Sequence, residues 1–127
     1  MRLQNNQLTS LHENFGKMNA LTEILLNDNY LSVLPESFYR LNKLKILDIH
    51  NNKLEKLSER FGELDELVDL NLTKNYLKKL PESFGFLSKL ENVTLSKNEL
   101  SSICSSFGKL NNLKILNANE NFLRNLP

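Results

Sequence analysis

The 127-residue chain has a single cysteine, Cys104, and no tryptophan. One cysteine excludes an internal disulfide. Its 16 basic and 15 acidic residues leave a net charge of +1, which gives no reason to expect nucleic acid or an anionic membrane as a partner. No apolar run approaches the roughly 18 residues of a membrane span, and no basic start followed by an apolar stretch indicates a signal peptide. The composition therefore predicts one soluble domain.

Motifs for metals and cofactors are also missing. The two histidines, His12 and His50, have no Cys or His partner at the spacing that metal ligands require. The chain contains neither a phosphate-binding loop nor a dinucleotide fingerprint. The sequence therefore predicts no metal site and no cofactor.

What the chain does contain is a repeat with a period of 23 residues. Each unit reads L-x-x-[LIV]-x-[LIA]-x-x-N-x-L-x-x-[LI], and the four complete units continue x-x-x-F-x-x-L. The units open at Leu21, Leu44, Leu67, Leu90 and Leu113. The asparagines are Asn6, Asn29, Asn52, Asn75, Asn98 and Asn121, and the phenylalanines are Phe15, Phe38, Phe61, Phe84 and Phe107. A fixed period of this length is typical of a solenoid.

The pattern resembles the leucine-rich repeat, whose core is L-x-x-L-x-L-x-x-N-x-L, over the whole chain. Its length and the pairs Leu34-Pro35, Leu80-Pro81 and Leu126-Pro127 are similar to the L-x-x-L-P subclass of Shoc-2, Scribble-type and plant intracellular Ras-group-related proteins. The resemblance implies an α/β fold: a right-handed, horseshoe-like solenoid with a parallel sheet on the concave face and short helical or 3₁₀ segments on the convex face. Extracellular family members usually carry cysteine-bonded caps, so the single cysteine predicts a cytoplasmic protein.

We expect one domain over residues 1–127 with about five and a half repeats. The expected units are 1–20 (partial), 21–43, 44–66, 67–89, 90–112 and 113–127 (partial). Neither end shows the polar cap that terminal repeats normally carry. The favoured interpretation is a fragment or a short isoform without caps, and the alternative is that the open ends dock a partner such as a second copy.

The third unit illustrates how the repeat is expected to fold. Apolar and polar residues alternate over 68–73, which predicts a half-buried strand with Leu70 and Leu72 inward and with Asp69, Asn71 and Thr73 outward. The same logic predicts parallel strands centred near Leu3, Leu26, Ile49, Leu72, Leu95 and Ala118. The asparagines are expected to bond buried backbone groups at the turn after each strand. The phenylalanines are expected to stack. Tyr39 takes a place that glycine holds in other units, which indicates that glycine is not obligatory, and we expect it on the convex surface with Arg40.

Outward-pointing strand residues form columns on the concave face, which is the usual binding surface of a solenoid. Apolar residues there have no core to fill, and acidic neighbours predict a partner with basic residues. The candidate protein-binding residues are Glu23, Leu25, Asn27, Tyr30, Ile46, Asp48, His50, Asp69, Asn71, Thr73 and Tyr76.

A catalytic interpretation starts from Asp48 and His50 on one strand face, with Thr73 and Ser96 in the same column. Residues i and i+2 of a strand project in parallel about 6.6 Å apart, which is too far for an ideal hydrogen bond between Asp48 and His50. No glycine-rich turn beside Ser96 offers an oxyanion site. The sequence therefore predicts no enzyme activity.

The leading hypothesis is a non-catalytic module that binds another protein on its concave face, as a signalling scaffold or regulator. The alternative is the substrate-recognition arm of a larger signalling enzyme or ubiquitin ligase whose catalytic part lies outside this chain. A structural spacer without a concave partner is the third hypothesis. Fold alone does not choose between them.

Overall fold

Each 23-residue unit contributes one short strand and one 3₁₀ helix (η). The computed structural model describes all 127 residues. The elements in chain order are η1 (Glu13–Lys17), β1 (Glu23–Leu25), η2 (Glu36–Arg40), β2 (Ile46–Asp48), η3 (Glu59–Glu63), β3 (Asp69–Asn71), η4 (Glu82–Phe86), β4 (Asn92–Thr94), η5 (Ser105–Lys109) and β5 (Ile115–Asn117). The strands form one parallel sheet in the order β1-β2-β3-β4-β5. No helix is long and apolar enough to cross a membrane.

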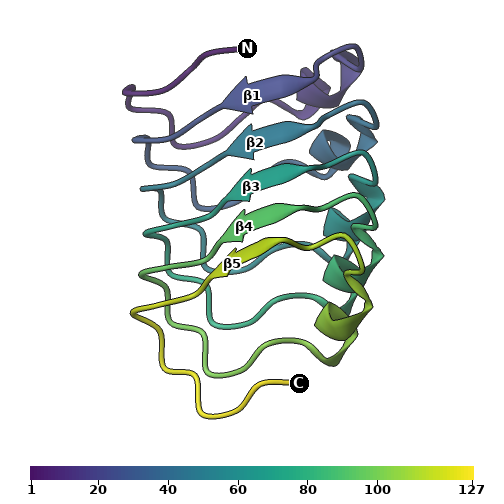
Figure 1. Ribbon diagram of the computed structural model, residues 1–127. Helices are drawn as coiled ribbons and strands as arrows, with labels where there is room; N and C mark the ends of the chain where they lie inside the picture. Colours follow the sequence, from purple (N-terminus) through teal and green to yellow (C-terminus); the bar gives the residue numbers. More distant parts are fainter.

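The chain winds as a right-handed solenoid, as predicted. In Figure 1 each strand runs from right to left across the front, and the chain returns behind the sheet to begin the next unit one level lower. The 3₁₀ helices lie together on the right, on the side opposite the arrow tips that mark the carboxyl ends of the strands. A right-handed connection is the strongly preferred sense for parallel crossovers.

The strands are shorter than the alternating pattern predicted, and their centres were placed two residues too late. β3 is centred on Leu70 instead of Leu72, because the chain turns soon after Asn71 and Lys74 adopts a positive φ of 59°. The expected first strand near Leu3 is reduced to a single bridge between Arg2 and Leu25. The inward and outward assignments in this unit are confirmed, since Leu70 and Leu72 are buried while Asp69, Asn71 and Thr73 are half-exposed.

The buried asparagines form the predicted hydrogen-bond ladder. Asn52 Nδ2 donates to Leu26 O at 3.0 Å in the preceding unit and to Ile49 O at 3.2 Å in its own unit. Its Oδ1 accepts a 2.9 Å bond from the Leu31 amide. Asn75 makes the equivalent bonds one unit further along. A carboxamide donates and accepts at once, so one side chain satisfies backbone groups that the turn leaves without partners.

The phenylalanine column is stacked except at one place. Ring centroids lie 5.7–5.8 Å apart with nearly parallel planes for Phe15–Phe38, Phe61–Phe84 and Phe84–Phe107. Between Phe38 and Phe61, the Tyr39 ring makes edge contacts at 6.0 Å to each. Tyr39 is only 3% exposed, so its expected place on the convex surface was wrong.

The core is open along the last unit. Leu116 of β5 is 40% exposed and Phe122 is 68% exposed, whereas Leu70 of β3 is 3% exposed. Every residue of β5 is exposed, because only β4 lies beside it in the sheet. Since each repeat buries its apolar face against its neighbours, this unit has the least packing.

Candidate functional site

The sheet arranges the outward residues in the predicted columns. The backbone register pairs Glu23 with Ile46 and Ile46 with Asp69. In the next column, Leu25 pairs with Asp48 and Asp48 with Asn71. Parallel pairing without a shift places equivalent residues of successive units side by side, so positions 23 residues apart in the sequence become neighbours in space.

One group of candidate residues surrounds a hollow on the sheet, called here the sheet hollow. It has a volume of about 300 Å³, and its lining consists of Leu25, Ile46, Leu47, Asp48, Asp69, Leu70, Asn71, Asn92 and Thr94. Five of the eleven candidates therefore meet in one place. Ile46 is 38% exposed, and Asp69 Oδ1 accepts a hydrogen bond from Asn92 Nδ2. The hollow combines an exposed aliphatic side chain with two carboxylates.

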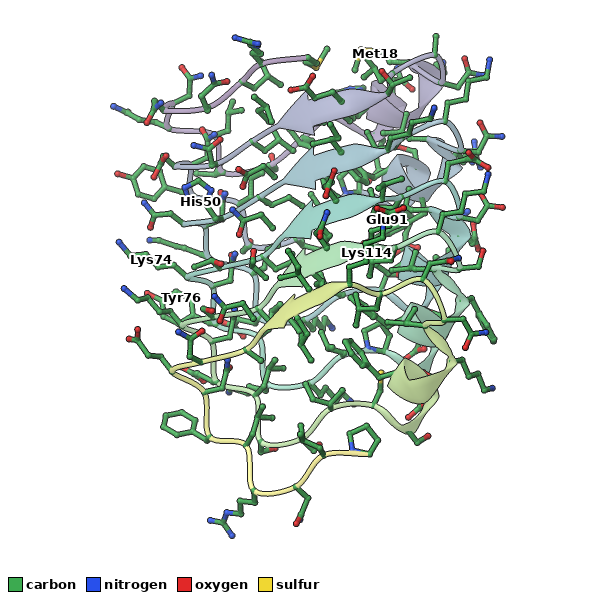
Figure 2. All side chains as sticks on the ribbon, viewed as in Figure 1. Met18, His50, Lys74, Tyr76, Glu91 and Lys114 are labelled. Atoms are coloured by element: carbon green, nitrogen blue, oxygen red, sulfur yellow. The ribbon has the colours of Figure 1, made fainter.

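A second group lies where the chain leaves the strands. This turn hollow has a volume of about 240 Å³, and its lining consists of Asn6, Asp28, Asn29, Tyr30, Asn51, Asn52, Lys53 and Tyr76. Tyr30 is 48% exposed and Tyr76 50% exposed. Lys53 lies between their units, with its ammonium 5.0 Å from the centre of the Tyr30 ring. Figure 2 shows His50, Lys74 and Tyr76 together on this side of the molecule.

His50 connects the two hollows, and its bond to Asp48 corrects the sequence-based expectation. His50 Nδ1 lies 2.6 Å from Asp48 Oδ1, although an i, i+2 pair in a strand was predicted to be too far apart. Because β2 ends at Asp48, His50 is no longer held in the strand geometry, and its amide also donates to Asp48 Oδ1 at 3.0 Å. The rest of the imagined catalytic trio is not assembled here, since Ser96 Oγ donates to Asn117 and Asn119 instead.

Asp28 was not among the candidates but is the most connected acidic residue of this face. It accepts hydrogen bonds from Asn27 Nδ2 at 2.7 Å and from Asn51 Nδ2 at 2.6 Å, and it lies 3.8 Å from His50 Nε2. The bond from Asn51 is the main cause that lowers the pKa of the Asp28 carboxyl, followed by the bond from Asn27. A sequence signal existed: Asp28 stands directly before a ladder asparagine, at the position that adopts positive φ in every unit.

The remaining candidates line neither hollow. Glu23 lies beside Ile46 in the first column, Asn27 holds Asp28, and the Thr73 amide donates to Asn71 Oδ1 at 3.1 Å. Together with Asp28, Asp48 and Asp69, Glu23 makes the first half of this face acidic. None of these four carboxylates forms an ion pair with a lysine or arginine, and the only basic side chain within 4.0 Å of any of them is that of His50.

Comparison with known proteins shows similarity both to a sequence family and to solved structures. A family model described as leucine rich repeat matches residues 1–54, 21–77 and 43–100. The structure is similar to that of a leucine-rich-repeat protein from Leptospira interrogans, with a TM-score of 0.95 and 34% sequence identity over 100% of this chain. The chain spans 33% of the length of that protein. No curated protein matches the sequence.

Proposed function

Because the chain belongs to the leucine-rich-repeat family, we propose that it is a non-catalytic module that binds another protein on its concave face. Leucine-rich-repeat domains are generally protein-interaction modules. Their parallel sheet exposes a long, regular surface on which side chains of several units contact one partner at once. By the subclass resemblance of its repeats, the module acts as a scaffold or regulator in signalling.

One observation carries this proposal: exposed apolar side chains gather on the same part of the face as carboxylates that form no ion pair with a lysine or arginine. Ile46, Tyr30 and Tyr76 are each 38% to 50% exposed, yet the face has no core that they could fill. Aromatic and aliphatic anchors inside a polar rim are what interface cores contain. The sheet hollow and the turn hollow provide two recesses for such anchors of a partner.

The charges define the chemistry of the partner. Glu23, Asp48 and Asp69 lie in adjoining columns, and no lysine or arginine neutralises them within the chain. A segment that carries Lys or Arg beside an apolar side chain fits both properties of the face. Complementary charges of this kind accelerate association and lose strength as salt rises, because the Debye length shortens to about 8 Å at 0.15 M ionic strength.

A second candidate is the recognition arm of a larger signalling enzyme or ubiquitin ligase. It is favoured by the similarity to a protein three times as long, in which this array corresponds to 33% of the chain. The exposed edge of β5 additionally offers a surface for self-association.

We place the module in the cytoplasm, where a reduced thiol persists. Cys104 is buried, and burial raises the pKa of its thiol.

The test compares affinity capture by the intact chain with capture by a variant altered on the concave face. Tyr30→Ser with Ile46→Ser removes one anchor from each hollow, and both side chains are exposed enough for folding to continue. The matched control changes two exposed convex residues, Arg40→Ser with Phe86→Ser. Tyr39 is unsuitable for this control because it is buried.

The expected result is loss of a salt-sensitive partner in the concave variant and its retention in the control, with identical melting profiles. Asp48→Asn with Asp69→Asn should weaken binding and flatten its dependence on salt. Retention by the concave variant together with loss in the control would move the site to the convex face and overturn the proposal. Chromatography of each sample separates binding by a monomer from binding by an assembly.

A further inference from the structure

The turns that carry the phenylalanines normally pack through a glycine and a serine. A Cβ added to Gly62 would lie 2.1 Å from Ser83 O in the next unit, so only glycine fits there. The Gly62 amide donates to Ser83 Oγ at 3.2 Å, and the Gly16 amide donates to Ser37 Oγ at 3.3 Å. The close approach of successive turns therefore depends on this pair. Glycine is required at Gly16, Gly62 and Gly85, whereas the expectation that it is not obligatory holds for Tyr39 and Gly108.

Between η2 and η3 both members of the pair are different. Tyr39 stands at the glycine position and Arg60 at the facing serine position. Arg60 Nη1 donates to Glu36 O at 3.1 Å, whereas Ser106 Oγ donates at 2.6 Å to Glu82 O, the equivalent carbonyl two units later. The arginine thus keeps the serine's hydrogen bond with a longer reach, while the tyrosine ring occupies the space between the turns.

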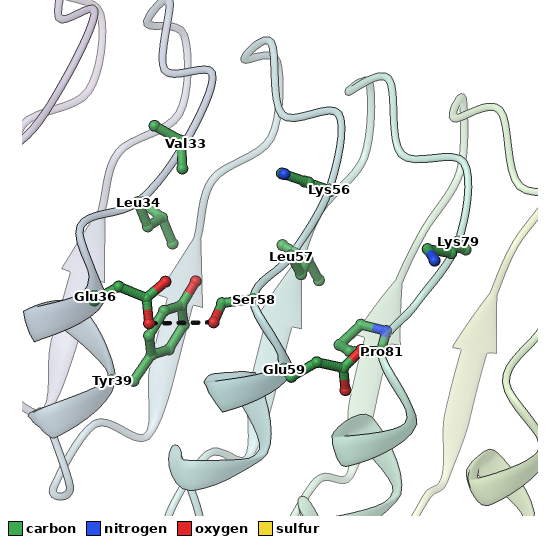
Figure 3. A pocket seen from close by; sticks show the side chains of 10 residues that line it. All are labelled: Val33, Leu34, Glu36, Tyr39, Lys56, Leu57, Ser58, Glu59, Lys79 and Pro81. Atoms are coloured by element: carbon green, nitrogen blue, oxygen red, sulfur yellow. Dashed lines mark hydrogen bonds between the residues drawn. The ribbon is translucent and has the colours of Figure 1, made fainter.

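A cavity of about 380 Å³ lies beside this tyrosine (Figure 3). Its apolar wall comes from Tyr39, Leu34, Leu57 and Pro81, with Val33 at 52% exposure. Burial raises the pKa of Tyr39 to about 12, consistent with a phenol withdrawn from solvent. The size falls within the range of pockets that hold small ligands or single anchoring side chains.

The two ends of the cavity carry opposite charges. Figure 3 shows Glu36 and Glu59 beside the starts of η2 and η3, and Lys56 and Lys79 at the other end. Glu36 is already engaged by Arg60, 3.8 Å away, and accepts a 3.3 Å bond from Ser58 Oγ.

The lysine end continues into an adjoining hollow. Lys56 and Lys79 line that hollow as well, together with Lys78, Ser101, Ser102 and one carboxylate, that of Glu55. None of the three lysines forms an ion pair within the chain. The lysine end therefore has an unmatched positive charge next to an apolar recess.

We propose that this cavity is a second binding site, which receives an acidic peptide segment of a protein partner. An aliphatic side chain of the segment enters between Leu34 and Leu57, and flanking carboxylates face Lys56, Lys78 and Lys79. The site lies on the opposite surface from the concave face and takes the opposite charge. The module therefore holds two segments of different chemistry without competition between them.

The chain itself supplies a variant that removes the tyrosine wall of the cavity. Tyr39→Gly with Arg60→Ser restores the pair found at the neighbouring interfaces. Lys56→Ser with Lys79→Ser removes two of the three lysines of the cationic end while changing only surface groups, and Ser102 already occupies the position equivalent to Lys79 one unit later. This second variant keeps the test decisive if the first does not fold.

The probe is the capped tripeptide Asp-Leu-Asp, titrated against the whole chain while the methyl resonances of Val33, Leu34 and Leu57 are followed by NMR. We expect saturable shifts of these methyls, with affinity at least tenfold lower in either variant. The matched peptides Lys-Leu-Lys and Asp-Gly-Asp should bind at least tenfold more weakly. Tyr30→Ser with Ile46→Ser, on the concave face, should leave the titration unchanged.

Absence of saturable shifts in the intact chain overturns the proposal. So does equal affinity for Lys-Leu-Lys, or unchanged affinity in the lysine variant. The concave face is acidic and is proposed to bind a basic partner, so it should not bind the acidic probe, and the concave variant tests this directly. Failure of the second-site proposal is therefore distinct from failure of the concave-face proposal. Loss of Asp-Leu-Asp binding in the concave variant alone would instead assign the peptide to the other face.

Discussion

Neighbouring ladder asparagines share carbonyl acceptors, and this sharing predicts a non-additive loss of stability. Ile49 O accepts from Asn52 Nδ2 at 3.2 Å and from Asn75 Nδ2 at 3.0 Å. Asn75→Ala leaves that carbonyl bonded to Asn52, but the Leu54 amide loses its 3.0 Å bond to Asn75 Oδ1. Asn52→Ala likewise leaves only the Leu31 amide without its acceptor.

Each single substitution therefore strands one buried amide, which costs about 1–3 kcal/mol in the free energy of unfolding. The double substitution strands both amides and also Ile49 O, which neither single change exposes. Its cost should exceed the sum of the single costs by about 1–3 kcal/mol, the penalty of one additional unpaired buried group. A total of roughly 3–9 kcal/mol is a large share of the 5–15 kcal/mol typical of a domain.

The parent chain, the two single variants and the double variant form a double-mutant cycle. Urea unfolding of these four proteins measures the coupling free energy between Asn52 and Asn75, with a fixed concentration of sucrose present to keep the double variant folded. The control cycle combines Asn29→Ala with Asn98→Ala. These side chains donate to different carbonyls, Leu26 O and Leu72 O among them, so their costs should add within about 0.5 kcal/mol. Additive costs for Asn52 and Asn75 as well would refute the shared-acceptor reasoning.

Three further outcomes are expected. Hydrogen exchange of the 127-residue monomer should be faster in β5 than in β3, because β5 is exposed throughout; equal protection would mean that the last unit is stabilised by contacts other than those described. Phe61→Ala should cost about 3–5 kcal/mol in urea unfolding, since Phe61 is fully buried and stacks at 5.8 Å, whereas Lys53→Ala should change stability by less than about 0.5 kcal/mol. The pKa of Asp28 is lowered in the folded chain, so this carboxylate stabilises the fold at a pH above its unfolded pKa of about 4, and that stability is lost as the pH falls through the lower folded pKa. Asn51→Ala should raise the folded pKa of Asp28 in an NMR titration. An unchanged pKa would contradict the assignment of the Asn51 hydrogen bond as its main cause.

The repeat period alone determined which side chains face inward. Because every unit has the same length, each position meets its counterpart 23 residues away, and one alternating segment fixes the strand face for all units. The burial of Leu70 and Leu72 and the hydrogen bonds of Asn52 follow from this regular spacing. The outward columns of the candidate site follow from it too, whereas their role in binding stays a prediction.

Contacts that break the repeat were decided only by the tertiary structure. The sequence shows Tyr39 at a glycine position and Arg60 at a serine position, but not that the two positions face each other, because 21 residues separate them. Asp48 and His50 meet because β2 ends between them, at a boundary that the alternating pattern does not mark. Asp28 becomes central only when Asn51 of the next unit reaches it. A period specifies what successive units share, whereas their differences act through side-chain packing in three dimensions.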